Sequence, residues 1–305
     1  MALDRRNFLQ TAAAAPLLCT IGGKTVDVAT ERDVELADRT AAKARRPTAL
    51  AAQAGDFPTP TAAPGGQVRE YWIQARSVTW DIAPRKVDEW MNERITGRTK
   101  FRAFVYQAMS TGFARPAGPA SMPGPTLEAE VGDLLKVHFR NADTRLNQAV
   151  TMHPHGVRYN PEYDGSYLGD HTRTGGFIGP GEEFTYRWEC VPESEGVWPY
   201  HDHGPNHTLN TMRGLFGALI VRPKGAKRPD VETVLTMHSF APQVTRLPRL
   251  FQVANGRSGA GNTPTIEARV GQDVAIHSIG FDNNFHTFHL HGHRWKDPSG
   301  AFVDN

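Results

Sequence analysis

The chain has 305 residues, of which 39% are hydrophobic, enough to bury a sizeable core in one or two domains. Its formal net charge is only +2, so the overall charge does not favour nucleic acid or an anionic membrane as a partner. Two cysteines exclude a disulfide scaffold and a cysteine-rich zinc or iron–sulfur site. Thirteen histidines are the unusual feature of the composition, and all lie between positions 138 and 293.

The N-terminus has the pattern of an export signal. Two adjacent arginines, Arg5 and Arg6, precede a short apolar run over residues 11–21. That run is too short for a membrane-spanning helix, which needs roughly 20 apolar residues. The order of basic, apolar and polar segments resembles a twin-arginine export signal. We therefore expect residues 1–23 to direct export to the periplasm or the extracellular space; the alternative is an N-terminal helix of the mature protein.

The next segment, residues 24–67, is rich in Ala, Pro, Thr and charged residues and has no apolar periodicity. This composition predicts a flexible linker rather than a domain.

A strand pattern then occurs twice. Residues 125–132 are PTLEAEVG and residues 264–271 are PTIEARVG, and both alternate apolar and polar side chains before a glycine, as a half-buried strand does. In the first copy the alternation resumes after Gly132 with Leu135 and Val137, which predicts a β-meander. The chain therefore carries two copies of one domain type, built of short strands in a sandwich or barrel.

The two copies differ in length. The first continues past its histidines to a strand pattern over residues 214–221, whereas the sequence ends at Asn305 soon after the histidines of the second. We expect one domain over residues 68–225 and a second, truncated domain over residues 226–305.

Three His-x-His pairs carry the chemistry. On a strand, residues i and i+2 project from the same face, so each pair offers two imidazoles to one site. Neutral imidazole suits copper, zinc, iron and nickel. The three pairs are His153/His155, His201/His203 and His289/His291.

The choice of metal follows from what surrounds these pairs. Six imidazoles without cysteine exceed what one zinc ion takes, and the absence of paired carboxylates argues against magnesium and calcium. A cupin-type site would need a Glu a few residues after a pair, and neither residues 156–159 nor residues 204–207 supply one. Imidazole pairs on two β-domains therefore favour a multinuclear copper cluster.

These segments resemble the multicopper oxidases, and most closely their two-domain, small-laccase-like branch. The resemblance covers residue 68 to the end. It implies an all-β fold of two cupredoxin-like Greek-key β-sandwich domains, the second incomplete. The segments that carry it are HPHG at 153–156, YHDH at 200–203, GLFGALIV at 214–221 and HTFHLHGHRW at 286–295.

The resemblance also implies copper of three types and assigns a role to each histidine. The implied ligands are His153 and His289 for type 2 copper, His155, His201, His203 and His291 for binuclear type 3 copper, and His286 for type 1 copper. The family's fourth motif, His-Cys-His, would fall beyond Asn305. For this reason we expect the sequence as it stands to be inactive.

The implied function is that of a laccase-like oxidase. Such enzymes couple one-electron oxidation of a phenol, an aromatic amine or a metal ion to reduction of oxygen to water at a three-copper cluster. Two-domain members form homotrimers. The alternatives are a copper-binding cupredoxin protein without turnover and a copper nitrite reductase. Asp202 weakens the last, because a Cys between the first-domain histidines would mark a type 1 site there.

Other residues beside the motifs have two interpretations each. Asp164, in a Tyr-Asp-Gly sequence, is either a carboxylate that relays protons to the cluster or a turn residue. Tyr159 lies near the cluster or packs in the core. Cys190 is interpreted as a buried thiol, with a disulfide to a further segment as the alternative, and Trp198 and Trp295 as core aromatics.

Overall fold

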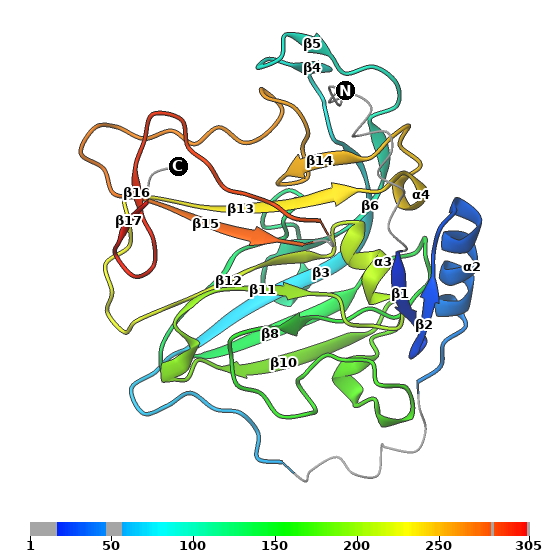
Figure 1. The fold of residues 1–305 in the computed structure, drawn as a ribbon. Helices are drawn as coiled ribbons and strands as arrows, with labels where there is room; N and C mark the ends of the chain where they lie inside the picture. The colour runs from blue at the N-terminus through cyan, green and yellow to red at the C-terminus, as the bar shows by residue number, and fades with distance from the viewer. Residues whose placement is uncertain (1–16, 47–56, 282–283, 304–305) are drawn as a thin grey trace.

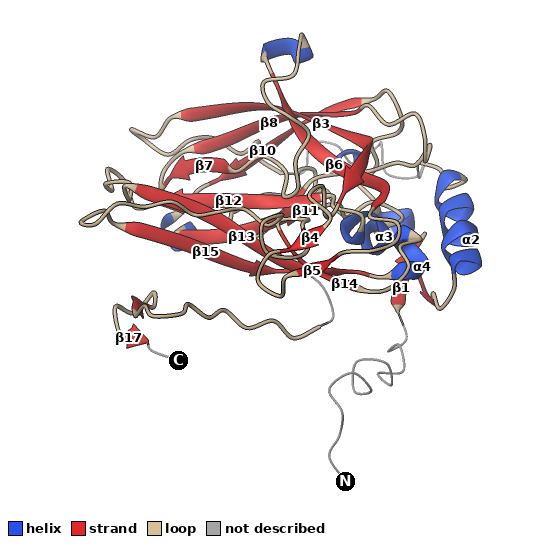
Figure 2. Ribbon diagram, turned by 90° about the horizontal axis from the view of Figure 1, so that it is seen from above, coloured by secondary structure: helices blue, strands red, loops and turns tan. Residues whose placement is uncertain are grey.

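The computed structural model describes residues 17–46, 57–281 and 284–303 and shows a mostly β-stranded protein (Figure 1). Residues 1–16 of the predicted export signal, with Arg5 and Arg6, lie outside these residues. Residues 17–23 are described: Leu18–Ile21 form a strand, and Cys19 and Ile21 are buried, so this part of the predicted signal packs into the fold. No helix in the described part of the chain is long and apolar enough to cross a membrane. The strands stack in three layers, which are seen edge-on in Figure 2.

The first layer is a sheet of four strands in the order β10-β8-β3-β6. Strands β3 and β8 are parallel, whereas β6 and β10 are antiparallel to their neighbours. The strands are β3 (Val68–Asp81), β6 (Lys100–Met109), β8 (Leu134–Asn141) and β10 (Glu183–Glu189).

The second layer is a sheet in the order β7-β12-β11-β9 and ends at the candidate site. Large aromatic side chains fill the space between the first two layers, so these two sheets form a sandwich around one core. The strands are β7 (Leu127–Glu130), β9 (His153–Pro154), β11 (Gly196–His201) and β12 (Phe216–Arg222). The fully buried aromatics of the core include Tyr106, Phe139, Tyr186, Trp188 and Tyr200.

The predicted β-meander at Gly132 is wrong, although both of its strands exist. Strand β7 pairs with β12, whereas β8 pairs with β3 and β10 in the other sheet. Gly132, at φ +96°, therefore turns the chain from one sheet to the other. The alternation predicted the buried face of each strand, since Leu127 and Leu135 both point into the shared core, but it carries no information on which strands pair.

The third layer is a three-stranded sheet, β14-β13-β15, packed on the outer face of β12. Its strands are β13 (Val231–Phe240), β14 (Phe251–Ala254) and β15 (Val274–Gly280). Phe216 of β12 stacks on Phe281 with ring centroids 4.2 Å apart. Because sheets cover it on both faces, all of β12 is buried, which explains its unbroken apolar sequence.

The second copy of the strand pattern does not form a strand. In the structure residues 264–269 have no regular secondary structure, residues 270–271 lie in a turn, and the side chains of Ile266 and Val270 are exposed. In the first copy the equivalent strand β7 is held by parallel pairing with β12, and no described residue offers such a partner to residues 264–271. The alternation alone was therefore not sufficient for strand formation.

The prediction of a flexible linker over residues 24–67 is wrong for its first half. Strands β1 (Leu18–Ile21) and β2 (Lys24–Asp27) form a hairpin, and helix α2 (Glu31–Ala42) follows. Thr30 and Asp33 form a capping box at the start of α2. Val34, Ala37 and Ala41 are buried, at a spacing that repeats along one helix face.

The remaining elements are short. They are helices α3 (His207–Met212) and α4 (Pro242–Thr245), strands β4 (Val87–Asp88), β5 (Glu93–Arg94), β16 (Trp295–Lys296) and β17 (Phe302–Val303), and 3₁₀ turns at Thr111–Phe113, Gly169–His171, Thr174–Gly176 and Pro192–Ser194.

Candidate metal centre

Two histidines lie opposite each other at the end of the second sheet. His153 in β9 and His201 in β11 are register partners of an antiparallel pair. Residues at such positions carry their side chains close together on one face. The sheet therefore brings together the first members of two His-x-His pairs that are far apart in the sequence.

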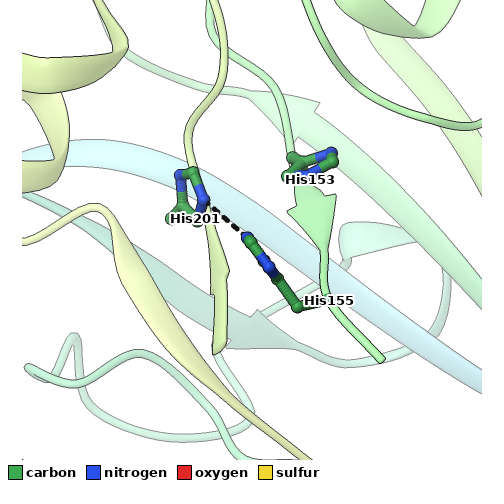
Figure 3. A group of neighbouring side chains, drawn as sticks. All are labelled: His153, His155 and His201. Carbon is green, nitrogen blue, oxygen red and sulfur yellow. Dashed lines mark hydrogen bonds between the residues drawn. The ribbon is translucent and has the colours of Figure 1, made fainter. Parts of the chain in front are cut away.

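His155 completes a group of three imidazoles. Its Nε2 lies 3.0 Å from Nε2 of His201, and one ligand nitrogen of each of the three histidines falls within 4.8 Å of the others. Figure 3 shows the rings of His155 and His201 directed at each other, with His153 beside them. His153 and His201 are half-buried and His155 is exposed, so the group is open to solvent on one side.

His203 is a fourth imidazole at the same place. Its ring centroid lies 5.1 Å from that of His153 and 5.8 Å from that of His201. Its Nδ1 is buried and has no hydrogen-bond partner. A buried polar atom without a partner is costly, and a ligand at this position would satisfy it.

His207 is a neighbour that the sequence analysis missed. It begins α3, and its ring stacks on that of His203 with centroids 4.5 Å apart. Burial, with the nearby His203, lowers the pKa of His207 to about 4. It lies only four residues after His203, a short separation in sequence that could have indicated the contact.

Two of the imidazoles are oriented by hydrogen bonds on their far nitrogen. Nδ1 of His153 lies 2.7 Å from the backbone oxygen of Asp164 and 3.1 Å from its carboxylate. Nδ1 of His201 lies 2.8 Å from the backbone oxygen of Asp202. With Nδ1–H donated in this way, Nε2 of each ring carries the lone pair, as in histidines that commonly ligate metals.

Asp164 lies in a turn, as one of its two interpretations states, and it is also a neighbour of the cluster; its role as a proton relay stays a prediction. Gly165 has φ +77°, and a Cβ there would fall 2.2 Å from the backbone oxygen of Met152. The turn thus requires glycine and places the carboxylate beside His153. Burial raises the pKa of Asp164, but hydrogen bonds with His153 and Ser166 outweigh it, so its pKa lies below the usual value.

Tyr159 lies on the same side of His153 as this carboxylate. The rings of Tyr159 and His153 are 5.9 Å apart in a T-shaped arrangement. Burial and the Asp164 carboxylate raise the pKa of Tyr159 to about 12. The phenol therefore stays protonated and can serve as a hydrogen-bond donor toward Asp164.

Asp202 is fully buried and holds the chain between two of the histidines. Its Oδ1 accepts hydrogen bonds from the backbone amides of Thr151 (2.8 Å) and Gly204 (3.1 Å). Its Oδ2 accepts one from Asn210 (2.9 Å). Burial raises the pKa of Asp202 to about 6 despite these bonds. Asp202 thus has a structural role of its own in fixing the path of the His201–His203 segment.

The electrostatics keep the imidazoles in the form that binds metals. Burial, partly offset by a hydrogen bond to the Asp202 backbone and reinforced by the other histidines, lowers the pKa of His201 to about 3. Burial and neighbouring imidazoles also lower the pKa of His155 and His203. Neutral nitrogen donors with one nitrogen directed inward fit copper.

The second-domain histidines lie apart from this group. His286, His289 and His291 belong to an extended segment without a strand, with His286 half-buried and the other two exposed. The rings of His289 and His291 are 4.5 Å apart, and Trp90 lies 5.7 Å from His291. Among the described residues, only His153, His155 and His201 meet as three close ligand atoms. The ligand roles of the second-domain histidines stay predictions.

The thiol and the tryptophans named in the sequence analysis are buried or packed. Cys190 is a free cysteine, 2% exposed, and burial raises its pKa to about 12. Trp198 packs on Gly156 and Trp295 on Phe288. These contacts agree with a structural role for all three.

Comparison with known proteins identifies the domain. The sequence model described as "Multicopper oxidase" matches residues 119–226, which include the four clustered histidines. A solved structure titled "Crystal structure of multicopper oxidase" superimposes with a TM-score of 0.51 and 26% identity, over 74% of this chain and 68% of that one. Residues 119–226 therefore match the multicopper oxidase domain family in sequence. Its cupredoxin-like fold, predicted from the sequence, is thereby confirmed.

Curated relatives of this chain are much longer proteins. A "Probable nitrite reductase-hydroxylamine oxidoreductase fusion protein" of Kuenenia stuttgartiensis is 32% identical over 200 residues, which are 62% of this chain and 22% of the relative. Coagulation factor V of Mus musculus is 30% identical over 254 residues, which are 75% of this chain and 11% of the relative. The chain thus spans about a fifth and about a tenth of these two relatives.

Proposed function

We propose that the chain is part of a laccase-like copper oxidase, which couples one-electron oxidation of a small reducing substrate to reduction of oxygen to water at a three-copper cluster. The observation that carries this proposal is the convergence of His153, His155 and His201, whose ligand nitrogens lie within 4.8 Å of one another. The family implies copper, and the nitrogen-only donor set agrees with it.

The clustered histidines would hold the first-domain half of the copper cluster. In this proposal His153 binds type 2 copper and His155, His201 and His203 bind the type 3 pair. The remaining ligands, His289 for type 2, His291 for type 3 and His286 for type 1 copper, come from the second domain. The orphaned Nδ1 of His203 and the inward Nε2 atoms of His153 and His201 support this assignment.

Bound copper would supply the one-electron chemistry, and the chain's own residues would handle orientation and protons. Asp164 fixes the ring of His153 through two acceptor oxygens and stays ionised at neutral pH. An ionised carboxylate next to the cluster can take up a proton from water and pass it on. The protonated phenol of Tyr159 can donate a hydrogen bond to that carboxylate.

The site also suggests how the protein assembles. His155 is exposed, and the second-domain histidines of the same chain lie apart from it. We propose a homotrimer in which domain 1 of one subunit meets domain 2 of the next, so that the two halves of the ligand set combine between subunits. We also propose export by the twin-arginine signal, so the protein would act in the periplasm or outside the cell on a phenol, an aromatic amine or a metal ion.

Copper nitrite reduction is the second candidate, because the relative from Kuenenia stuttgartiensis carries that activity in its name. Asp202 opposes it. A first-domain type 1 site would need a thiolate between His201 and His203, and the buried Asp202 instead accepts hydrogen bonds there.

The test is to express the protein from its native gene with copper and to measure oxygen uptake with a phenolic donor, and nitric oxide production from nitrite. We expect donor-dependent oxygen uptake without hydrogen peroxide release, and no nitric oxide. Nitric oxide production without oxygen uptake would overturn the proposal in favour of nitrite reduction. Copper uptake with neither activity would overturn it in favour of a copper-binding protein without turnover.

A further inference from the structure

An ion pair between half-buried Asp38 and buried Arg213 ties helix α2 to the body of the protein. The carboxylate oxygens of Asp38 lie 2.8 Å and 2.7 Å from Nη1 and Nη2 of Arg213, a two-pronged contact. Arg213 directly follows α3 and is 5% exposed. Two parallel hydrogen bonds between an arginine and a carboxylate fix the orientation of the two side chains as well as the distance between them.

The same carboxylate satisfies two buried amides. Oδ1 of Asp38 accepts hydrogen bonds from Nε2 of Gln148 (2.9 Å) and from Nδ2 of Asn206 (3.0 Å). Gln148 is 1% exposed and Asn206 is fully buried. Removal of the acceptor would leave buried donors with fewer partners, which is costly.

From Arg213, hydrogen bonds continue to the segment that carries His201 and His203. Nη1 of Arg213 lies 3.5 Å from Oδ1 of Asn210, and Nδ2 of Asn210 donates to Oδ2 of Asp202 (2.9 Å). Asp202 in turn holds the amides of Thr151 and Gly204. Asn206, the other partner of Asp38, lies three residues after His203.

We infer that Asp38 is a positioning residue for the first-domain histidines, acting through Arg213, Asn210 and Asp202. The N-terminal segment is then a working part of the metal centre, because α2 fixes the backbone that carries His201 and His203. This inference rests on the proposed function as far as copper is concerned, while the geometry of the histidine segment can be measured without copper.

A second ion pair of α2 provides a matched control. Glu35 lies one turn before Asp38 in sequence and pairs with Arg246 at the end of α4. Both of these side chains are about half exposed, with 52% and 51% exposed side-chain area. Such surface pairs contribute little to stability. Among the residues that the structure describes, no chain of hydrogen bonds or ion pairs links the Arg246 side chain to Asp202.

The experiment compares Asp38→Asn with Glu35→Gln in the full chain, using Cu(II) ions alone as the probe. We expect Asp38→Asn to weaken Cu(II) binding by about tenfold, the low end of the effect of residues that orient ligands, and to change the Cu(II) electron paramagnetic resonance spectrum. Glu35→Gln should leave affinity within about twofold of the unaltered protein and the spectrum unchanged. Circular dichroism of both variants verifies that they fold.

Amide hydrogen exchange without copper gives the second readout. Asp38→Asn should speed exchange of the Thr151 and Gly204 amides, which Asp202 holds, and Glu35→Gln should not. The double variant, Asp38→Asn with Asn210→Ala, should lose less Cu(II) affinity than the sum of the losses in the two single variants, because both substitutions act through Asp202. Unchanged exchange and affinity in Asp38→Asn, or equal changes in both variants, would overturn the inference.

The two readouts separate the inference from the proposed function. If the unaltered protein binds no Cu(II), the proposed function fails and the exchange rates still decide the role of Asp38. If it binds Cu(II) and Asp38→Asn leaves affinity, spectrum and exchange unchanged, the inference fails and the proposed function stands.

Discussion

Gly156 lies against the indole ring of Trp198 so closely that a Cβ at position 156 would fall 2.1 Å from Cδ2 of the ring. Gly156 also has φ +71°, a backbone conformation that side chains other than glycine rarely adopt. Because Gly156 directly follows His155, this contact fixes the path of the chain behind one imidazole of the candidate metal centre. The glycine of the HPHG segment is thus explained by geometry.

Gly156→Ala should therefore destabilise the protein and disturb His155. The left-handed backbone and the overlap with Trp198 together should lower the free energy of unfolding by about 2–4 kcal/mol, as measured by urea denaturation. Gly181→Ala is the control, because Gly181 has φ +81° and open space around it. It should lose only the backbone contribution, about 1 kcal/mol. Equal losses in the two variants would show that Trp198 does not confine position 156.

Asp164→Asn should separate proton transfer from metal binding. The backbone oxygen of Asp164, 2.7 Å from Nδ1 of His153, stays in place in the variant, so copper affinity should fall by less than the roughly 10- to 100-fold loss that removal of a ligand-orienting partner typically causes. In the protein expressed from its native gene, loss of the ionised carboxylate should slow oxygen reduction by about 100-fold or more. Tyr159→Phe, which keeps the ring against His153, should have a smaller effect on the rate. A large loss of copper with Asp164→Asn would mean that the carboxylate mainly orients His153.

Copper binding should depend weakly on pH in the mildly acidic range. Burial lowers the pKa of His201 to about 3, and that of His155 also lies below its ordinary value. A lowered pKa means that the folded protein keeps these rings neutral as the pH falls below about 6.5, where free imidazole becomes charged and stops binding metals.

The pH dependence of copper affinity can be measured by competition titrations at about pH 7 and about pH 5.5. The protein should lose much less affinity between them than a short peptide with a His-x-His sequence. The lowered pKa of His201 also affects folding. In the metal-free protein the free energy of unfolding should decrease as the pH falls from about 6.5 toward 3, because His201 takes up a proton in the unfolded chain but not in the folded protein. An equal loss of affinity in protein and peptide would contradict the burial of these rings.

The chain of residues 1–305 should bind copper without the intense visible colour of a thiolate–copper site. Both cysteines are buried and free, and burial raises the pKa of Cys19 to about 11 and that of Cys190 to about 12. A blue copper site needs a cysteine thiolate as ligand, and neither thiol meets the histidine group. An absorption spectrum of the copper-loaded chain measures this, and strong blue absorption would show that Cys190 or Cys19 binds the metal.

The sequence predicted the sandwich fold, because alternating apolar and polar residues reveal the buried face of each strand. It also predicted the histidine pairs, because residues two apart on a strand share one face. It could not show that His153 and His201 are register partners, since strand pairing depends on contacts between distant segments. The strand pattern at residues 264–271 has no pairing strand in the described structure and forms none.

Helix α2 was missed although its signals were in the sequence. Thr30 and Asp33 have the spacing of a capping box, and Val34, Ala37 and Ala41 repeat on one face. The alanines gave little apolar contrast against the charged residues around them, so the segment resembled a linker in composition. Its partner Arg213 lies far away in the sequence, and their contact follows only from the fold.

The most direct test of the account is Cu(II) binding by the clustered histidines, followed by electron paramagnetic resonance in the unaltered chain, in His201→Ala and in His277→Ala. His277 pairs with Glu232 outside the cluster and serves as the control. We predict nitrogen-coordinated Cu(II) in the unaltered chain and in His277→Ala, and at least about tenfold weaker binding in His201→Ala. Equal binding in all three would contradict a metal centre built on His153, His155 and His201.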